Sequence, residues 1–91
     1  MTVAERRFDR LHDVAASAAA EGDDERAREY VRLARRLAER HRLRVPEPFR
    51  RSTCDACDAY LRPDANARVR TRDGHVAVTC DCGHVSRYPY D

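Results

Sequence analysis

The chain has 91 residues and a net charge of +2, with 42% hydrophobic and 37% charged residues. A chain of this length supports one small domain or two half-domains that share a core, and such a core often needs a metal, disulfides or a partner. No apolar run approaches the roughly 20 residues of a membrane span, and the N-terminus lacks the apolar region of a signal peptide. We therefore expect a cytoplasmic protein that does not enter a membrane. In that compartment the four cysteines are expected as metal ligands or free thiols rather than disulfides.

The basic residues are unevenly distributed. All 18 are Arg and none is Lys. A GC-rich genome would explain this composition, and so would contacts with phosphates and bases, for which Arg is better suited. Residues 32–53 hold eight Arg against two acidic residues, a net charge of +6, whereas residues 1–31 carry −3 and residues 54–91 carry −1. Such a block is either a solvated helix face or an anion-binding surface.

Residues 1–45 show the pattern of two helices. Apolar residues recur at helical spacing over residues 8–18 and again over residues 27–41. Gly22 closes the first helix and Pro46 stops the second. The short connection predicts an antiparallel hairpin with a thin, Ala-rich core, whose apolar faces either pack only on each other or also contact a partner. The residues expected at or under a contact with another protein are Phe8, Leu11, Tyr30 and Leu37.

A β-hairpin is the clearest local signal of the second part. In "ARVRTRDGHVAVTC", the Asp-Gly pair at residues 73–74 favours a two-residue type I′ turn between alternating segments. Closing this turn pairs Arg72 with His75 and sets the register. Because side chains alternate along a strand, Arg68, Arg70 and Arg72 share one face and the valines share the other. This Arg ladder either protects a sheet edge or binds phosphate.

Four cysteines stand in two close pairs around this hairpin. Cys54 and Cys57 form a C-x2-C pair, and Cys80 and Cys82 form a C-x-C pair. Two pairs separated by a hairpin are typical of a zinc ribbon, in which four thiolates surround one Zn²⁺. The second pair is one residue short of the usual spacing, so the chain must bend between its cysteines. Two alternatives stay open: His84 replaces Cys82 as a ligand, or the thiols are free.

These elements predict a small α+β protein with an N-terminal antiparallel helix hairpin and a C-terminal zinc ribbon of antiparallel strands. The expected boundaries are residues 1–45 for the hairpin, 46–53 for a basic linker and 54–91 for the ribbon, with one Zn²⁺ per chain. We find no Ser-His-Asp set, no phosphate-binding loop and no carboxylate cluster beside a substrate pocket. The sequence therefore predicts no catalytic residues of its own.

Three segments resemble the archaeal ribonuclease P protein component 4 family: "YVRLARRLAERHRLRVP", "CDACDAYLRPDANARVRTRDG" and "VTCDCGHVSRYPY". The resemblance covers nearly the whole chain, although the family usually has C-x2-C where this chain has C-x-C. It implies a non-catalytic subunit of the ribonucleoprotein that removes 5′ leaders from precursor tRNA, with the RNA as catalyst. It also implies that the paired helices dock on ribonuclease P protein component 1.

The implied partners are ribonuclease P RNA, protein component 1 and other subunits, with precursor tRNA contacted indirectly. The joining segment is expected beside the root of the hairpin, so that its arginines and the Arg ladder form one basic surface. Tyr88 and Tyr90 either pack on the protein or stack on unpaired bases. The alternative function is a zinc-ribbon adaptor that binds only protein in a transcription or ribosome-assembly complex. The RNA-binding candidates are Arg42, Arg44, Arg50, Arg51, Arg68, Arg70, Arg72, Arg87 and Tyr88.

Overall fold

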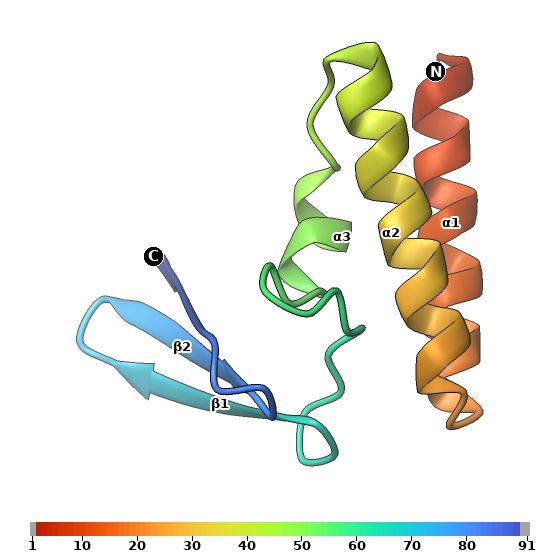
Figure 1. Ribbon diagram of the computed structural model, residues 1–91. Helices are drawn as coiled ribbons and strands as arrows, with labels where there is room; N and C mark the ends of the chain where they lie inside the picture. Colours follow the sequence, from red (N-terminus) through yellow and green to blue (C-terminus); the bar gives the residue numbers. More distant parts are fainter. Residues whose placement is uncertain (1, 90–91) are drawn as a thin grey trace.

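The computed structural model describes residues 2–89, which form three helices followed by a three-stranded antiparallel sheet (Figure 1). The predicted fold class is therefore confirmed. Tyr90, part of the predicted aromatic tail, lies outside the described residues. The elements are α1 (Val3–Ala20), α2 (Asp24–His41), α3 (Glu47–Arg51), β1 (Ala67–Arg72), β2 (His75–Cys80) and β3 (Val85–Pro89).

The ends of the two long helices are set by local capping. Thr2 and Glu5 form a capping box at the start of α1, in which each side chain accepts from the other residue's backbone N–H. The chain then turns at Gly22, whose φ is +82°. Asp23 caps α2, because its carboxylate accepts from the N–H of Arg26 at 3.2 Å. This connection makes α1 and α2 the predicted antiparallel hairpin.

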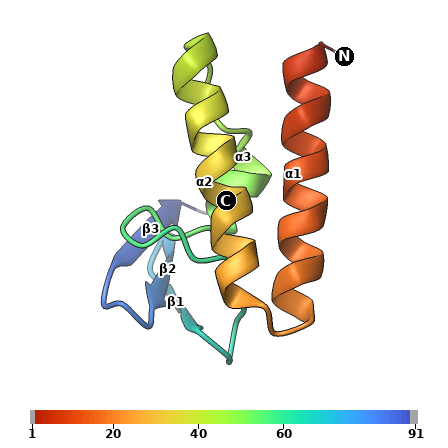
Figure 2. The ribbon, with the colours of Figure 1, turned by 45° about the vertical axis from the view of Figure 1, so that its right-hand side comes forward.

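The core between the long helices is built mainly from alanine. Ala15 of α1 and Ala34 of α2 are buried where the helices face each other, together with Phe8. Helix α3 lies beside the two long helices (Figure 2) and inserts Phe49, which is 1% exposed, into the same core. The chain itself therefore covers part of the apolar surface that the sequence left open for a partner.

Side chains from the second part of the chain complete this core. The imidazole of His12 stacks on the ring of Phe49, with centroids 4.6 Å apart, and its Nε2 lies 3.1 Å from the hydroxyl of Tyr60. His12 is thus a packing residue. His41, expected in the apolar stripe of the second helix, is instead exposed at the end of α2.

The segment predicted as a basic linker contains a helix. α2 ends at His41, and Arg42 follows in the left-handed conformation with φ +54°. Pro46 then precedes α3, which occupies most of residues 46–53. The three predicted boundaries stay predictions, but this segment packs on the hairpin through Phe49 rather than only joining two parts.

The sheet projects to one side of the helices (Figure 1). β1 and β2 pair in the predicted register, from Arg72 opposite His75 to Ala67 opposite Cys80. β3 adds to the other edge of β2, with Tyr88 opposite Val76. This third strand was not predicted. Among residues 2–89, no helix has both the length and the apolar character needed to cross a membrane.

Candidate metal centre and basic surfaces

The four predicted metal ligands converge on one point. They come from two short segments, which we call the first knuckle (Cys54 and Cys57) and the second knuckle (Cys80 and Cys82). The Sγ atoms of Cys54 and Cys82 are 3.6 Å apart, those of Cys57 and Cys80 are 3.7 Å apart, and all four lie within 4.8 Å of one another. Tetrahedral coordination with bonds of about 2.3 Å places sulfurs about 3.8 Å apart. The cluster therefore fits a single tetrahedral ion, and these residues could hold one. His84 is not part of this cluster in the described chain.

The first cysteine pair lies on a tight loop. The N–H of Asp58 donates to the carbonyl of Cys54 at 2.9 Å, and the N–H of Cys54 donates to the carbonyl of Ala59 at 2.9 Å. Asp58 itself is in the left-handed region with φ +64°, a conformation that Asp tolerates better than most residues. This loop turns both thiols of the pair toward the same point.

The second pair reaches the cluster because the chain turns sharply after β2. The N–H of Gly83 donates to the carbonyl of Cys80, and the N–H of Cys80 donates to the carbonyl of His84, each at 2.9 Å. Gly83 has φ +97°, where a side chain would strain the backbone. The bend predicted between Cys80 and Cys82 is confirmed, and it compensates for the missing residue of the C-x-C pair.

The thiols differ in how readily they ionise. Burial raises the pKa of Cys54 and raises that of Cys80 to about 12. Burial also acts to raise the pKa of Cys57, but the N–H of Ala59 and the neighbouring sulfurs outweigh it and lower that pKa to about 7. Without a cation, the thiols of Cys54 and Cys80 are therefore protonated at neutral pH, so binding a metal ion through them must displace protons.

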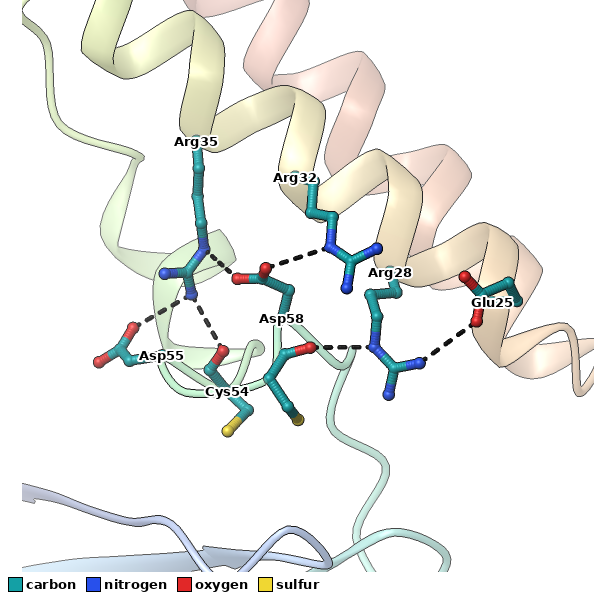
Figure 3. A network of polar contacts seen from close by, with 8 residues as sticks. Glu25, Arg28, Arg32, Arg35, Cys54, Asp55 and Asp58 are labelled. Atoms are coloured by element: carbon teal, nitrogen blue, oxygen red, sulfur yellow. Dashed lines mark hydrogen bonds and ion pairs between the residues drawn. The ribbon is translucent and has the colours of Figure 1, made fainter.

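Three arginines of α2 hold the first knuckle against the hairpin (Figure 3). Arg28 donates through Nε to the carbonyl of Cys57 at 2.9 Å. Arg35 donates through Nη2 to the carbonyl of Cys54 at 3.1 Å, and its Nε lies 2.9 Å from a carboxylate oxygen of Asp58. We call Arg28, Arg32 and Arg35 the arginine stripe.

Sequence reasoning missed the role of the arginine stripe, although a signal was present. The three residues are spaced i, i+4 and i+7, which places them on one face of a helix. The two aspartates of the first knuckle, Asp55 and Asp58, are complementary in charge. These arginines and aspartates are 20 to 26 residues apart in sequence, so their pairing depends on how the hairpin and the ribbon dock.

Asn66 is a second structural residue that the sequence did not identify. Its side chain accepts from the N–H of Arg62 at 2.6 Å and donates to the carbonyl of Tyr60 at 2.9 Å. Its own carbonyl accepts from the N–H of Asp81 at 2.9 Å, inside the second cysteine pair. Asn66 therefore joins the loop before β1 to the turn that presents Cys82.

The Arg ladder has the predicted arrangement and is extended by β3. Arg68, Arg70 and Arg72 share one face of β1, and Arg87 adds a fourth arginine on the same face. Arg70 and Arg87 flank Ala77 of the central strand, so small residues form the floor of a hollow of about 540 Å³ with arginines at its sides. We call this surface the basic sheet face.

The arginines of the joining segment do not merge with the basic sheet face. The guanidinium of Arg51 lies 4.8 Å from the ring centroid of Tyr88, which is on the opposite face of the sheet. Arg51 also pairs with Glu47 at 2.6 Å. Arg44 and Arg50 border a separate hollow of about 380 Å³ between α2 and α3. The expectation of one continuous basic surface is therefore wrong for these three arginines, because Arg51 contacts the opposite face of the sheet and Arg44 and Arg50 border a hollow that no sheet residue lines.

Three of the four predicted partner contacts line a hollow on the hairpin. Leu11, Tyr30 and Leu37 are half-buried there, and Leu33, which is 45% exposed, lies among them. We call this surface, of about 520 Å³, the hairpin groove. Phe8 is only 2% exposed and belongs to the chain's own core, so it lies beneath any contact rather than in it. The groove is apolar, with Arg7 and Arg10 at its edge.

Comparisons with known proteins agree on one family. The family described as "RNAse P Rpr2/Rpp21/SNM1 subunit domain" matches residues 7–83. Ribonuclease P protein component 4 of Halobacterium salinarum (strain ATCC 29341 / DSM 671 / R1) is 68% identical, over 98% of this chain and 96% of that protein. The protein of the same name from Methanosarcina barkeri (strain Fusaro / DSM 804) is 40% identical, over 97% of this chain and 82% of that protein.

Two solved structures share the fold. A chain of "cryo-EM structure of archaeal Ribonuclease P with mature tRNA" is 39% identical with a TM-score of 0.90, covering 97% of this chain and 77% of that one. "Pfu Rpp21 structure and assignments" is 37% identical with a TM-score of 0.64, covering 93% and 97%. From the helix hairpin, the four gathered cysteines and these matches, we conclude that this chain belongs to the RNAse P Rpr2/Rpp21/SNM1 subunit domain family.

Proposed function

We propose that this chain is a non-catalytic protein subunit of ribonuclease P, which binds the enzyme's RNA and supports RNA-catalysed removal of 5′ leaders from precursor tRNA. The observation that carries the proposal is the match over 97% of the chain, at a TM-score of 0.90, to a chain of an archaeal ribonuclease P structure with mature tRNA. The 68% identity to a ribonuclease P protein component 4 supports the same role. The cytoplasm as its location stays a prediction.

The proposed metal is one Zn²⁺ per chain, held by Cys54, Cys57, Cys80 and Cys82. Sulfur separations of 3.6 and 3.7 Å support it, because they fit tetrahedral coordination by thiolates. The cluster has no ligand position left for substrate or water, which is typical of a structural rather than a catalytic ion. The ion would join the loop after α3 to the turn after β2, and so hold the sheet in place.

Among the predicted RNA-binding arginines, the proposed RNA contacts are those whose side chains have no hydrogen bond or ion pair within residues 2–89. An unpaired guanidinium can contact phosphate without first breaking an ion pair. Arg51 and Tyr88 already contact each other, and Arg72 has a contact of its own, so these three are secondary candidates. The primary candidates are Arg42, Arg44, Arg50, Arg68, Arg70 and Arg87.

The proposed protein partner is ribonuclease P protein component 1, and the hairpin groove is its docking surface. The exposed Leu33 and the half-buried apolar side chains around it support this assignment, because their burial would stabilise a complex. Other subunits of the enzyme and precursor tRNA would be reached through the assembled particle.

Reconstitution tests the proposal directly. Ribonuclease P RNA and the other protein subunits are assembled with and without this chain, and cleavage of precursor tRNA at its 5′ leader is measured. Omitting the chain should reduce cleavage, and the chain alone should cleave nothing. A chain that neither binds the RNA in a salt-dependent way nor changes cleavage would refute the proposal and favour an adaptor that binds only protein.

A further inference from the structure

The contacts of the arginine stripe fall on the metal ligands themselves. Arg28 donates to the carbonyl of Cys57, and Arg35 donates to the carbonyl of Cys54 (Figure 3). Both acceptors belong to residues whose thiols lie in the metal cluster. A hydrogen bond to the carbonyl of a ligand residue limits rotation of that peptide, and so limits where its Sγ can point.

Arg35 makes three contacts with the first knuckle at once. Its Nη2 reaches the carbonyl of Cys54 at 3.1 Å and a carboxylate oxygen of Asp55 at 3.2 Å, while its Nε pairs with Asp58 at 2.9 Å. The planar guanidinium can serve several acceptors in fixed directions, which an ammonium group cannot. Arg32 differs from its neighbours in the stripe, because its contact is with the side chain of Asp58 alone.

The charges around the cluster also favour this arrangement. Four thiolates around one divalent cation carry a net charge of −2, and Asp55 and Asp58 add two more negative charges beside them. The arginine stripe supplies three positive charges on the side that faces α2. Because Arg28 is also paired with Glu25 at 3.4 Å, the stripe offsets part of the charge that a metal-bound knuckle would concentrate there.

We propose that Arg28 and Arg35 of α2 are positioning residues of the metal centre, so that metal binding and docking of the ribbon on the hairpin stabilise each other. The proposal rests on the zinc site proposed above. Coupling of this kind is reciprocal: contacts from α2 raise the affinity for the ion, and the ion strengthens the contacts with α2 by the same factor. Because β2 runs directly into the second cysteine pair at Cys80, the ion also controls how the basic sheet face is held relative to the helices.

The test measures the affinity of the full chain for Zn²⁺ by competition with a chromophoric chelator. The variants are Arg28→Ala, Arg35→Ala and Arg35→Lys. The matched control is Arg36→Ala, which removes the same charge from the next position of α2, where the side chain is exposed and has no contact within residues 2–89.

Loss of an outer-shell hydrogen bond to a metal site typically costs about 10- to 100-fold in affinity. We expect a loss of roughly that size for Arg28→Ala and for Arg35→Ala. Arg35→Lys should recover only part of the loss, because one ammonium cannot reach both the carbonyl and the carboxylates. Arg36→Ala should change the affinity by less than about twofold, because it removes no contact with the knuckle.

Two further measurements separate positioning from general folding. Far-ultraviolet circular dichroism of the zinc-loaded variants should show unchanged helix content, and a variant that has lost helix is replaced by its Lys counterpart. With Co²⁺ in place of Zn²⁺, the sulfur-to-metal charge-transfer band should keep its intensity but require more Co²⁺ to saturate. The reverse experiment is proteolysis at the hairpin–ribbon junction, which should be faster after chelation.

Several results would overturn the proposal. Equal Zn²⁺ affinities for wild type and the Arg28 and Arg35 variants, at equal helix content, would refute the coupling between metal binding and docking. The proposed zinc site would not be affected by that result. An equal loss in Arg36→Ala would mean that only net charge matters. If the wild-type chain binds no Zn²⁺ at all, this inference and the proposed metal site both fail.

Discussion

Replacing Arg68 and Arg70 together with alanine should weaken binding of the chain to ribonuclease P RNA and reduce the salt dependence of that binding. Alternate residues of β1 place the two side chains on the basic sheet face, roughly 6.6 Å apart along the strand. Arg87 lies across the small Ala77, two strands from Arg70 and thus about 9.6 Å away. The three can therefore contact separate phosphates of one RNA strand.

The magnitude follows from counterion release. Each lost phosphate contact makes the slope of log affinity against log salt less steep by roughly 0.7–0.9, so two contacts account for roughly 1.4–1.8. At about 0.1 M salt the same term corresponds to a loss of affinity of roughly 25- to 60-fold. Zinc content should not change, because both side chains point away from the cysteine cluster.

The assay is a salt titration of RNA affinity with the chain paired with protein component 1, since the partner can supply part of the same surface. The control is Arg36→Ala with Arg40→Ala, which removes two exposed arginines from α2 and leaves the sheet unchanged. The control should keep the wild-type slope. A wild-type slope and affinity in the Arg68 and Arg70 double variant would show that the ladder is only a protected sheet edge, and the protein-only adaptor would then be favoured.

Three other predictions concern the metal and the partner. Metal analysis should find one Zn²⁺ per chain, and chelation should unfold the ribbon while part of the helical signal remains. His84→Ala should leave zinc affinity unchanged. A protein without zinc, or a strong effect of His84→Ala, would contradict the four-cysteine site. Zinc affinity should rise with pH, because the raised pKa of Cys80 means that its proton must leave, and the dependence should steepen below about 7, where Cys57 must also lose one. Affinity that does not vary with pH, measured by chelator competition, would refute this ligand set. Leu33→Asp in the hairpin groove should abolish pairing with protein component 1 in a pull-down. Leu43 is 47% exposed and lies outside the groove, so Leu43→Asp should not affect pairing. Intact pairing in Leu33→Asp would place the interface elsewhere.

Local chemistry made much of the fold predictable. The Asp-Gly turn at residues 73–74 and the alternation around it were sufficient for the register of β1 and β2, and hence for the common face of Arg68 and Arg70. The break at Gly22 and the helical spacing of apolar residues were sufficient for the helix hairpin. These features depend on residues close together in sequence, where a short pattern restricts the conformation strongly.

The convergence of the four cysteines was predicted from their spacing, but the way in which the C-x-C pair reaches the cluster was only partly predicted. The bend between Cys80 and Cys82 was required by the sulfur separations alone. The support for that bend is the carbonyl of Asn66, which accepts from Asp81. Asn66 is fourteen residues before Cys80, and the contact exists because β1 and β2 bring the two loops together.

What the sequence by itself determined was therefore local: two helices, one β-hairpin with its Arg face, and two cysteine pairs suited to one ion. What only the tertiary structure decided was which arginine meets which partner. A pattern of arginines at helical spacing looks the same whether it faces water, RNA or protein, and only docking of the ribbon on α2 brings Arg35 to Asp58. Docking likewise places Arg51 over the ring of Tyr88, on the face of the sheet opposite to the one that carries Arg70. The physical reason is that a guanidinium pairs with whichever anion or aromatic ring the fold brings within a few ångströms. Contacts between segments that are far apart in the sequence decide which anion or ring that is.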